Sequence, residues 1–153
     1  MLKSTFCHIP GIGHATEKKL WNAGICNWQD LLDWPDSVKR VSPQDILSTL
    51  ESSLKALGTN PIFFTRLLKN HDRWRLFPHF REKTAYLDIE TSGLGHDAEI
   101  TAIALYDGTE VRTYVNGRNL DDFLEDIDSF QVLVSYNGIS FDIPFIERFF
   151  GTT

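Results

Sequence analysis

Two kinds of hydrophobic pattern divide the chain near residue 84. Before that position, apolar residues recur every three or four residues, which is the period of an amphipathic helix. After it, short apolar segments rich in β-branched and aromatic residues alternate with turn residues, which is typical of strands. The sequence therefore predicts the α/β class, with a small helical unit at 1–59, a connector at 60–83 and a mixed sheet domain at 84–153.

The helical unit is expected to contain a glycine turn followed by several helices. Pro10-Gly11-Ile12-Gly13 reads as a tight turn, because glycine permits positive φ and close approach of another chain. A helix follows, with Ala15, Leu20 and Trp21 on its apolar side and Gly24 at its end. Apolar spacing predicts two further helices, one containing Trp28, Leu31 and Leu32 and one carrying Ile46, Leu47, Leu50, Leu54 and Leu57.

Residues 84–153 predict the element order β-β-β-α-β-α. Strands are expected at 84–91, 99–106, 109–115 and 131–136, and helices at 119–128 and 142–149. Asp107-Gly108 predicts a two-residue hairpin, so that the second and third strands pair antiparallel. The last strand is almost continuously apolar, which favours a buried strand that is parallel to its neighbour after a right-handed crossover.

The net charge of −6 conceals a difference between the two parts of the chain. Residues 1–83 carry twelve Lys and Arg and eight Asp and Glu, whereas residues 84–153 carry three and thirteen. This division suggests a basic binding part joined to an acidic part. No apolar run reaches the length of a membrane span, so no membrane partner is expected.

Cys7 and Cys26 fit no CxxC motif and suggest reduced thiols in a cytoplasmic protein. They lie with His8 and His14 in one short region, which raises the question of a zinc site. The spacing matches no common zinc motif, so packing of small residues is the better explanation.

The connector combines basic and aromatic side chains. It holds six Lys and Arg against two acidic residues. Basic groups can contact phosphates and aromatic rings can stack on bases, as in grooves that bind single-stranded nucleic acid. Alternatively, the aromatic rings pack against the rest of the protein while the charges face water. The candidate nucleic-acid-binding residues here are Arg66, Lys69, Arg73 and Arg75.

The glycine turn and the helix after it resemble the helix-hairpin-helix motif, in which backbone N–H groups of a glycine hairpin bind a phosphate. Amides at a helix N-terminus form an anion site that reads no base sequence. The candidate contacts are Gly11, Gly13, Lys18 and Lys19. Residues 1–8 leave little room for the helix that normally precedes the hairpin, and a helical packing unit is the alternative.

Three carboxylates provide the main chemical signal. Asp88 and Glu90 alternate with apolar residues, so both side chains point to one face of a strand. Asp142 follows the last strand where it gives way to a helix, and sites in open α/β sheets form at such strand ends. Converging carboxylates repel one another unless a cation lies between them, and all-oxygen ligands favour Mg²⁺ or Mn²⁺.

The segments YLDIETSGL and SYNGISFDIPFIERFF resemble the first two motifs of the DEDD exonucleases, which have a ribonuclease H-like fold. The first matches D-x-E at Asp88 and Glu90, and the second matches N-x-x-x-F-D at Asn137, Phe141 and Asp142. The helical N-terminus followed by WRLFPHFREKTAYLDIETSGL resembles the YprB-like branch. The resemblance implies metal-dependent 3′→5′ exonuclease chemistry on DNA or RNA, single-stranded or at a 3′ end. Asp88, Glu90 and Asp142 would be catalytic ligands of two Mg²⁺ or Mn²⁺ ions, which stabilise the attacking and leaving oxygens.

The chain departs from this family in one respect. The family takes a fourth carboxylate, and in many members a His or Tyr that orients water, from a helix well downstream of the second motif. The sequence ends at Thr153, so we expect 84–153 to form the N-terminal half of a nuclease domain with an incomplete two-metal site. The alternatives are a non-catalytic nucleic-acid-binding module on the same scaffold, and a fragment that needs a partner protein or a further C-terminal segment.

Overall fold

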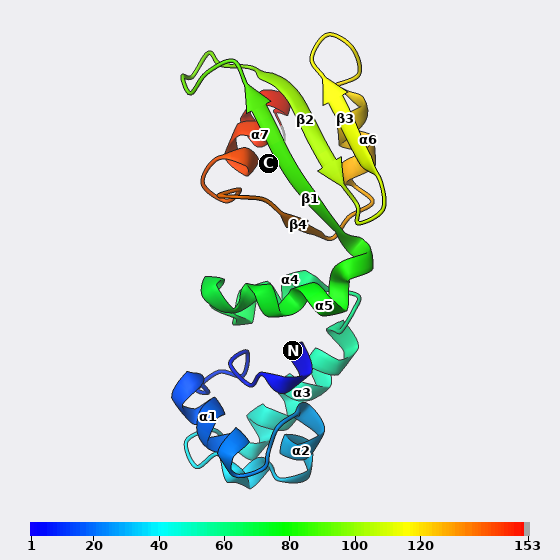
Figure 1. The fold of residues 1–153 in the computed structure, drawn as a ribbon. Coiled ribbons are helices and arrows are strands. Elements are labelled where there is room, and N and C mark those ends of the chain that lie inside the picture. The colour runs from blue at the N-terminus through cyan, green and yellow to red at the C-terminus, as the bar shows by residue number, and fades with distance from the viewer. Residues whose placement is uncertain (152–153) are drawn as a thin grey trace. The chain divides into compact units, whose positions relative to one another are not determined.

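The structure is a computed structural model that describes residues 1–151, and these form two compact units, residues 1–80 and 81–151 (Figure 1). The first unit is helical and the second is built around a mixed sheet, which confirms the predicted α/β class. Residues 60–80, which the sequence sets apart as part of a connector, are helical and lie within the first unit. No helix among residues 1–151 is long and apolar enough to cross a membrane.

The first unit consists of short helices packed around one apolar core. Their bounds are η1 Leu2–Ser4, α1 His14–Asn22, α2 Trp28–Asp33, η2 Pro35–Ser37, α3 Pro43–Ala56, α4 Pro61–Leu67, η3 Asn70–Leu76 and α5 Phe77–Phe80. Proline occupies the first helical position of α3 and α4, where its missing N–H costs no hydrogen bond. Asn27 and Asp30 form a reciprocal capping box at the start of α2.

The buried face of α1 differs from the predicted one. Leu20 is buried as expected, but Ala15 is exposed and Trp21 is partly exposed. The other buried residue of the helix is Glu17, which is only 1% exposed. Glu17 can occupy this position because Thr5 Oγ1 and the Phe6 N–H both donate hydrogen bonds to Glu17 Oε2. Periodicity alone could not identify a buried carboxylate.

The second unit has a four-stranded sheet with the order β3-β2-β1-β4. Its elements are η4 Arg81–Lys83, β1 Thr84–Thr91, β2 Ile100–Tyr106, β3 Val111–Val115, α6 Asp122–Ile127, β4 Val132–Val134 and α7 Asp142–Phe150. β1 pairs antiparallel with β2 and parallel with β4, and β2 pairs antiparallel with β3. This arrangement confirms the predicted element order, the antiparallel hairpin and the parallel last strand.

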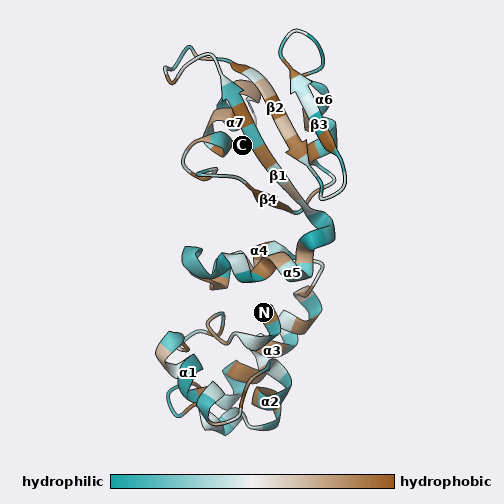
Figure 2. Ribbon diagram, viewed as in Figure 1, coloured by the Kyte–Doolittle hydropathy of each residue, from teal (hydrophilic) through white to brown (hydrophobic). Residues whose placement is uncertain are grey.

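The helices α6 and α7 cover one face of the sheet (Figure 1). Leu87 and Ile89 of β1 point to this face and share a core with Phe123 of α6 and Phe145 of α7. Hydrophobic and hydrophilic residues alternate along β1 (Figure 2), as side chains on opposite faces of a strand require. On the opposite face of β1, Tyr86, Asp88 and Glu90 are exposed to water, whereas Thr84 at the start of the strand is buried.

Two details of the sheet differ from the prediction. The connection between β2 and β3 is a four-residue loop rather than a two-residue turn, because Asp107 Oδ1 accepts hydrogen bonds from the Thr109 and Glu110 N–H groups. The strand β4 is also shorter than expected, and Leu133 and Val134 are more than a third exposed. The described residues place β4 at the edge of the sheet, so its apolar sequence does not signify burial here.

Candidate functional site

The carboxylates of β1 lie on the exposed face of the sheet. Asp88 and Glu90 are exposed, whereas Leu87 and Ile89 are buried. On the neighbouring strand, Ala104 lies opposite Asp88 and Ala102 lies opposite Glu90. These small side chains leave room above both carboxylates. Water screens the repulsion between the two charges, so the strand tolerates them without a bound cation.

Asp142 lies in a different environment. It is the first residue of α7 and is only 3% exposed, and its carboxylate accepts a hydrogen bond from the Ser135 hydroxyl. A Cβ added at Gly138 would lie 2.8 Å from Ser135 Cβ and 3.5 Å from Asp142 Oδ2. Glycine is therefore required for the turn to pass this close to the carboxylate. Neither Ser135 nor Gly138 stood out in the sequence as a site residue.

Asn137 and Phe141, the supporting residues of the second motif, shape the same turn. Asn137 has a positive φ of 59°, a conformation that asparagine tolerates better than most residues. Its carbonyl accepts hydrogen bonds from the Ser140 and Phe141 N–H groups. The Phe141 ring packs against Phe145, with ring centroids 5.6 Å apart, and so ties the turn to α7. Both residues act by placing Asp142.

The structure does not gather the three carboxylates into one cluster. Among residues 1–151, the sole group of three or more Cys, His, Asp and Glu ligand atoms within 4.8 Å of one another lies in the first unit. Asp88 and Glu90 are hard oxygen donors on one open face, and this chemistry suits Mg²⁺ or Mn²⁺. Asp142 would have to reach an ion through its other carboxylate oxygen in order to join them, because Oδ2 already accepts the hydrogen bond from Ser135.

A groove in the second unit adjoins the exposed face of β1. Its lining includes Arg81, Lys83, Tyr86 and Tyr106. The two tyrosine rings lie 5.9 Å apart between centroids, and Tyr86 shares its face of β1 with Asp88 and Glu90. Basic groups beside aromatic rings can contact phosphates and stack on bases. Sequence reasoning did not select these four residues, although the pairing of Tyr86 with Tyr106 follows from the hairpin register.

The glycine turn predicted at Pro10-Gly11-Ile12-Gly13 is present in the first unit. Gly11 has a φ of 88°, and a Cβ there would lie 2.9 Å from Val41 Cγ2, so this position requires glycine. Gly13 is the N-cap of α1 and is exposed, and a Cβ added there would meet no atom within 4 Å. Lys18 and Lys19 are exposed on α1. Lys18 lies in the middle of α1 and Lys19 in its last turn, so neither cation is at the helix end that carries Gly13.

The four basic residues of the connector fall into two classes. Arg66 and Lys69 are exposed, as a contact with phosphate requires. Arg73 Nη2 donates a hydrogen bond to the Thr65 carbonyl. The Arg75 guanidinium, 13% exposed, forms ion pairs with Glu17 and Asp72. Arg73 and Arg75 therefore bond within the protein.

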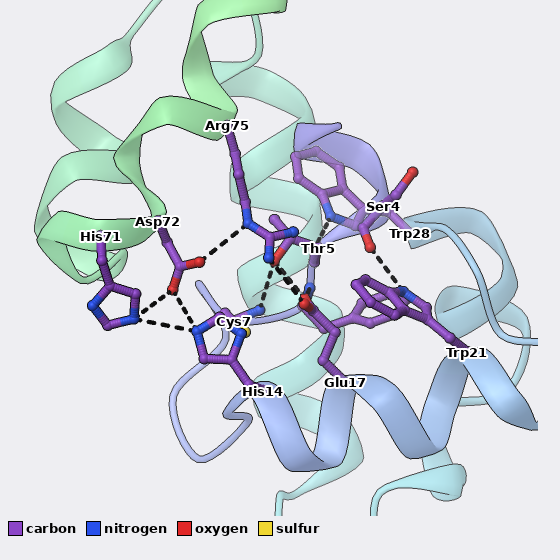
Figure 3. Close-up of polar contacts among 11 residues, drawn as sticks. Ser4, Thr5, Cys7, His14, Glu17, Trp21, Trp28, His71, Asp72 and Arg75 are labelled. Carbon is purple, nitrogen blue, oxygen red and sulfur yellow. Dashed lines mark hydrogen bonds and ion pairs between the residues drawn. The ribbon is translucent and has the colours of Figure 1, made fainter.

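Two of the four residues first considered for zinc do come together. Cys7 Sγ lies 3.8 Å from His14 Nδ1, and His71 and Asp72 of η3 join them (Figure 3). His8 is instead buried against the Trp28 ring, and burial lowers the pKa of its imidazole to about 4. Cys26 is exposed next to α2. The sequence did not predict that His71 and Asp72 join Cys7 and His14, because η3 lies far from Cys7 along the chain.

Comparison with known proteins gives one match. No curated protein and no solved structure matches the chain. Residues 85–153 match a family model described as RNase_H superfamily. Proteins of this superfamily act on nucleic acids and usually use divalent metal ions. The matched segment contains Asp88, Glu90 and Asp142 and, with its mixed β3-β2-β1-β4 sheet, fits the RNase H superfamily.

Proposed function

We propose that the second unit is the metal-binding part of a 3′→5′ exonuclease of the DEDD type. Asp88, Glu90 and Asp142 would be its metal ligands, and Mg²⁺ or Mn²⁺ its cofactor. The observation that carries this proposal is the pair of carboxylates on one open face of β1, within the segment that matches the superfamily. Divalent ions at these residues would stabilise the attacking and leaving oxygens of a phosphodiester displacement.

The residues around the carboxylates suit a nucleic-acid strand. Tyr86 and Tyr106 offer ring faces for base stacking, and Arg81 and Lys83 offer charges for phosphates in the same groove. A strand bound there would pass beside the face that carries Asp88. Ser135 would hold Asp142 in place, because its hydroxyl donates to that carboxylate.

The first unit would add a second, less specific contact. Gly11 and Gly13 precede the N-terminus of α1, where backbone N–H groups favour an anion, and Lys18 and Lys19 are exposed further along the same helix. Arg66 and Lys69 are the exposed cations of the connector segment. We infer that these groups bind phosphates in the manner of a helix-hairpin-helix motif and without regard to base sequence.

Metal binding tests the proposal most directly. Titration of Mn²⁺ into the full chain, followed by electron paramagnetic resonance of the free ion, should show a weak site. The double variant Asp88→Asn, Glu90→Gln should lose it, because carboxylates provide the charge that attracts the ion. Asp97→Asn, which removes an exposed carboxylate in the loop after β1, is the matched control and should bind as the wild type does. Equal Mn²⁺ affinity in all three proteins would contradict a metal site at Asp88 and Glu90.

A second candidate function is a nucleic-acid-binding module without catalysis. The three carboxylates do not form a cluster, whereas the groove with Tyr86 and Tyr106 is already in place. Salt-dependent binding of nucleic acid, together with no Mn²⁺ site at Asp88, would support this module. Separately, the location of the protein in the cytoplasm remains a prediction, which rests on the free thiols of Cys7 and Cys26.

A further inference from the structure

A cluster of potential metal ligands lies in the first unit, apart from the carboxylates of the sheet (Figure 3). We name it the N-terminal cluster, and its members are Cys7, His14, His71 and Asp72. Cys7 precedes the glycine turn, His14 begins α1, and the other two are consecutive residues of η3. Three separate segments thus contribute sulfur, nitrogen and oxygen donors to one place.

Three of these donors form a nearly equilateral triangle. His14 Nε2 lies 3.2 Å from His71 Nε2 and 3.1 Å from Asp72 Oδ2. The third side, from His71 Nε2 to Asp72 Oδ2, measures 3.4 Å. Nitrogen and oxygen ligands about 2.1 Å from a tetrahedral zinc ion lie about 3.4 Å from one another. The triangle therefore has the size of one face of a zinc coordination tetrahedron.

We propose that the N-terminal cluster binds one Zn²⁺ ion. His14, His71 and Asp72 provide one face of the tetrahedron, and the Cys7 thiolate provides the fourth ligand. One ligand atom from each of Cys7, His14 and Asp72 lies within 4.8 Å of the others. The Cys7 sulfur lies 3.8 Å from His14 Nδ1, whereas the triangle uses His14 Nε2, so the Cys7 side chain has to turn toward the triangle in order to bind the same ion. Imidazole and thiolate donors favour zinc over Mg²⁺ or Mn²⁺.

The surroundings of Asp72 support a bound cation. Its Oδ1 accepts a hydrogen bond from Arg75 Nε, which fixes the carboxylate and leaves Oδ2 directed at the two histidines. Such outer contacts orient ligands in metal sites. Asp72 and Glu17 are both buried, and one guanidinium, that of Arg75, compensates them. A zinc ion with one thiolate adds a single positive charge and completes the neutralisation.

A zinc ion at this place would fix the glycine turn. Cys7 and His14 flank Pro10–Gly13, so binding both would hold the two ends of the turn against η3. The turn carries the backbone groups proposed to contact phosphate. The zinc site itself does not depend on that proposal, since its ligands point at one another rather than at the open N–H groups.

Zinc content and affinity provide the first test. The untagged full chain is stripped with a chelator, reloaded with Zn²⁺ and analysed by mass spectrometry of the bound metal, with competition against a chromogenic chelator. We expect one zinc ion per chain. His14→Ala and His71→Ala should each weaken binding at least tenfold, and both should fold, because these side chains are 54% and 63% exposed. His96→Ala, at an exposed histidine of the second unit, should bind as the wild type does.

Cobalt substitution tests the role of Cys7. A thiolate bound to Co²⁺ gives a charge-transfer band in the near ultraviolet, and tetrahedral Co²⁺ gives strong visible bands. The near-ultraviolet band should be present in the wild type and in Cys26→Ser, the matched control at the other free cysteine, and absent in Cys7→Ser. If the near-ultraviolet band persisted in Cys7→Ser, Cys7 would not be the fourth ligand. Failure to bind one zinc ion, or zinc affinity unchanged in both histidine variants, would overturn the site.

Discussion

At the residue scale, the buried side chain of Asp142 has a hydrogen-bond partner in Ser135. Ser135 donates that bond within a turn that also needs Gly138. We predict that Ser135→Ala destabilises the protein by about 1–3 kcal/mol, since a buried acceptor then loses its partner. Chemical denaturation measures the difference. Ser140→Ala, at an exposed serine of the same turn, is the control and should change the free energy of unfolding by much less.

A second prediction at this scale concerns Tyr114. Burial, with the hydrogen bond that its hydroxyl donates to Asp126, raises the pKa of Tyr114 to about 12. Below pH 10 the phenol is protonated in both the folded and the unfolded protein. Between about pH 10 and 12 only the unfolded protein releases the proton, so this contribution to stability should fall as the pH rises.

Denaturation curves at pH 9 and pH 11 test this expectation. The wild type should lose more stability over the interval than Tyr114→Phe, which lacks the titrating group. Tyr136→Phe is the matched control, because it removes the hydroxyl of a tyrosine that is 95% exposed. Equal pH dependence in the wild type and Tyr114→Phe would contradict the prediction.

At the scale of elements, the sequence predicted those whose pattern is set by local contacts. The alternation along β1 placed Asp88 and Glu90 together on one face, and the hairpin between β2 and β3 fixed its antiparallel pairing. Both depend on the two-residue period of a strand or on a turn. The position of Asp142 at the start of α7 followed from the same local pattern.

Contacts between distant segments were not predictable in this way. The length of β4 was overestimated because an apolar run at a sheet edge resembles a buried strand. The sequence predicts that Glu17 is a solvated helix residue, because its ion pair with Arg75 joins segments that are far apart along the chain. His71 and Asp72 reach Cys7 and His14 only through the packing of η3 on the N-terminal segment. The spacing of hydrophobic residues within one segment cannot predict such contacts between segments.

One prediction belongs to α1 as an element. Glu17 anchors this helix through Thr5, the Phe6 N–H and Arg75. Glu17→Ala should destabilise the protein by about 3 kcal/mol or more, because buried donors lose their acceptor and Arg75 retains one carboxylate. Thermal or urea unfolding measures the effect. Glu51→Ala, at an exposed position of α3, is the control, and a comparable loss there would refute the anchoring role.

At the scale of the whole molecule, nucleic-acid binding should depend on exposed cations of the first unit. Lys18→Gln combined with Lys19→Gln should weaken binding of single-stranded DNA or RNA equally for different base sequences. It should also reduce the slope of log affinity against log salt by about 1.4, since two phosphate contacts are lost. Fluorescence anisotropy measures both quantities. Lys55→Gln on α3 is the control, and an unchanged slope in the double variant would exclude these contacts.

Cleavage is the strictest test of the proposed nuclease chemistry. Rate in such reactions comes from placing ions, water and substrate together, and residues that act as a unit lose activity together. Asp88 and Glu90 are exposed on the sheet while Asp142 is buried beside Ser135, and the three do not cluster. We therefore predict that the chain alone cleaves nucleic acid very slowly or not at all.

A 3′-labelled single-stranded substrate with Mn²⁺ measures this rate. A further protein segment that carries a fourth carboxylate, supplied in trans, should increase cleavage, and the increase should vanish in Asp88→Asn, Glu90→Gln but not in Asp97→Asn. The reason is that added ligands can organise an ion only where the β1 carboxylates already attract it. Rapid cleavage by the chain alone, abolished by the double variant, would show that the three carboxylates suffice for the chemistry.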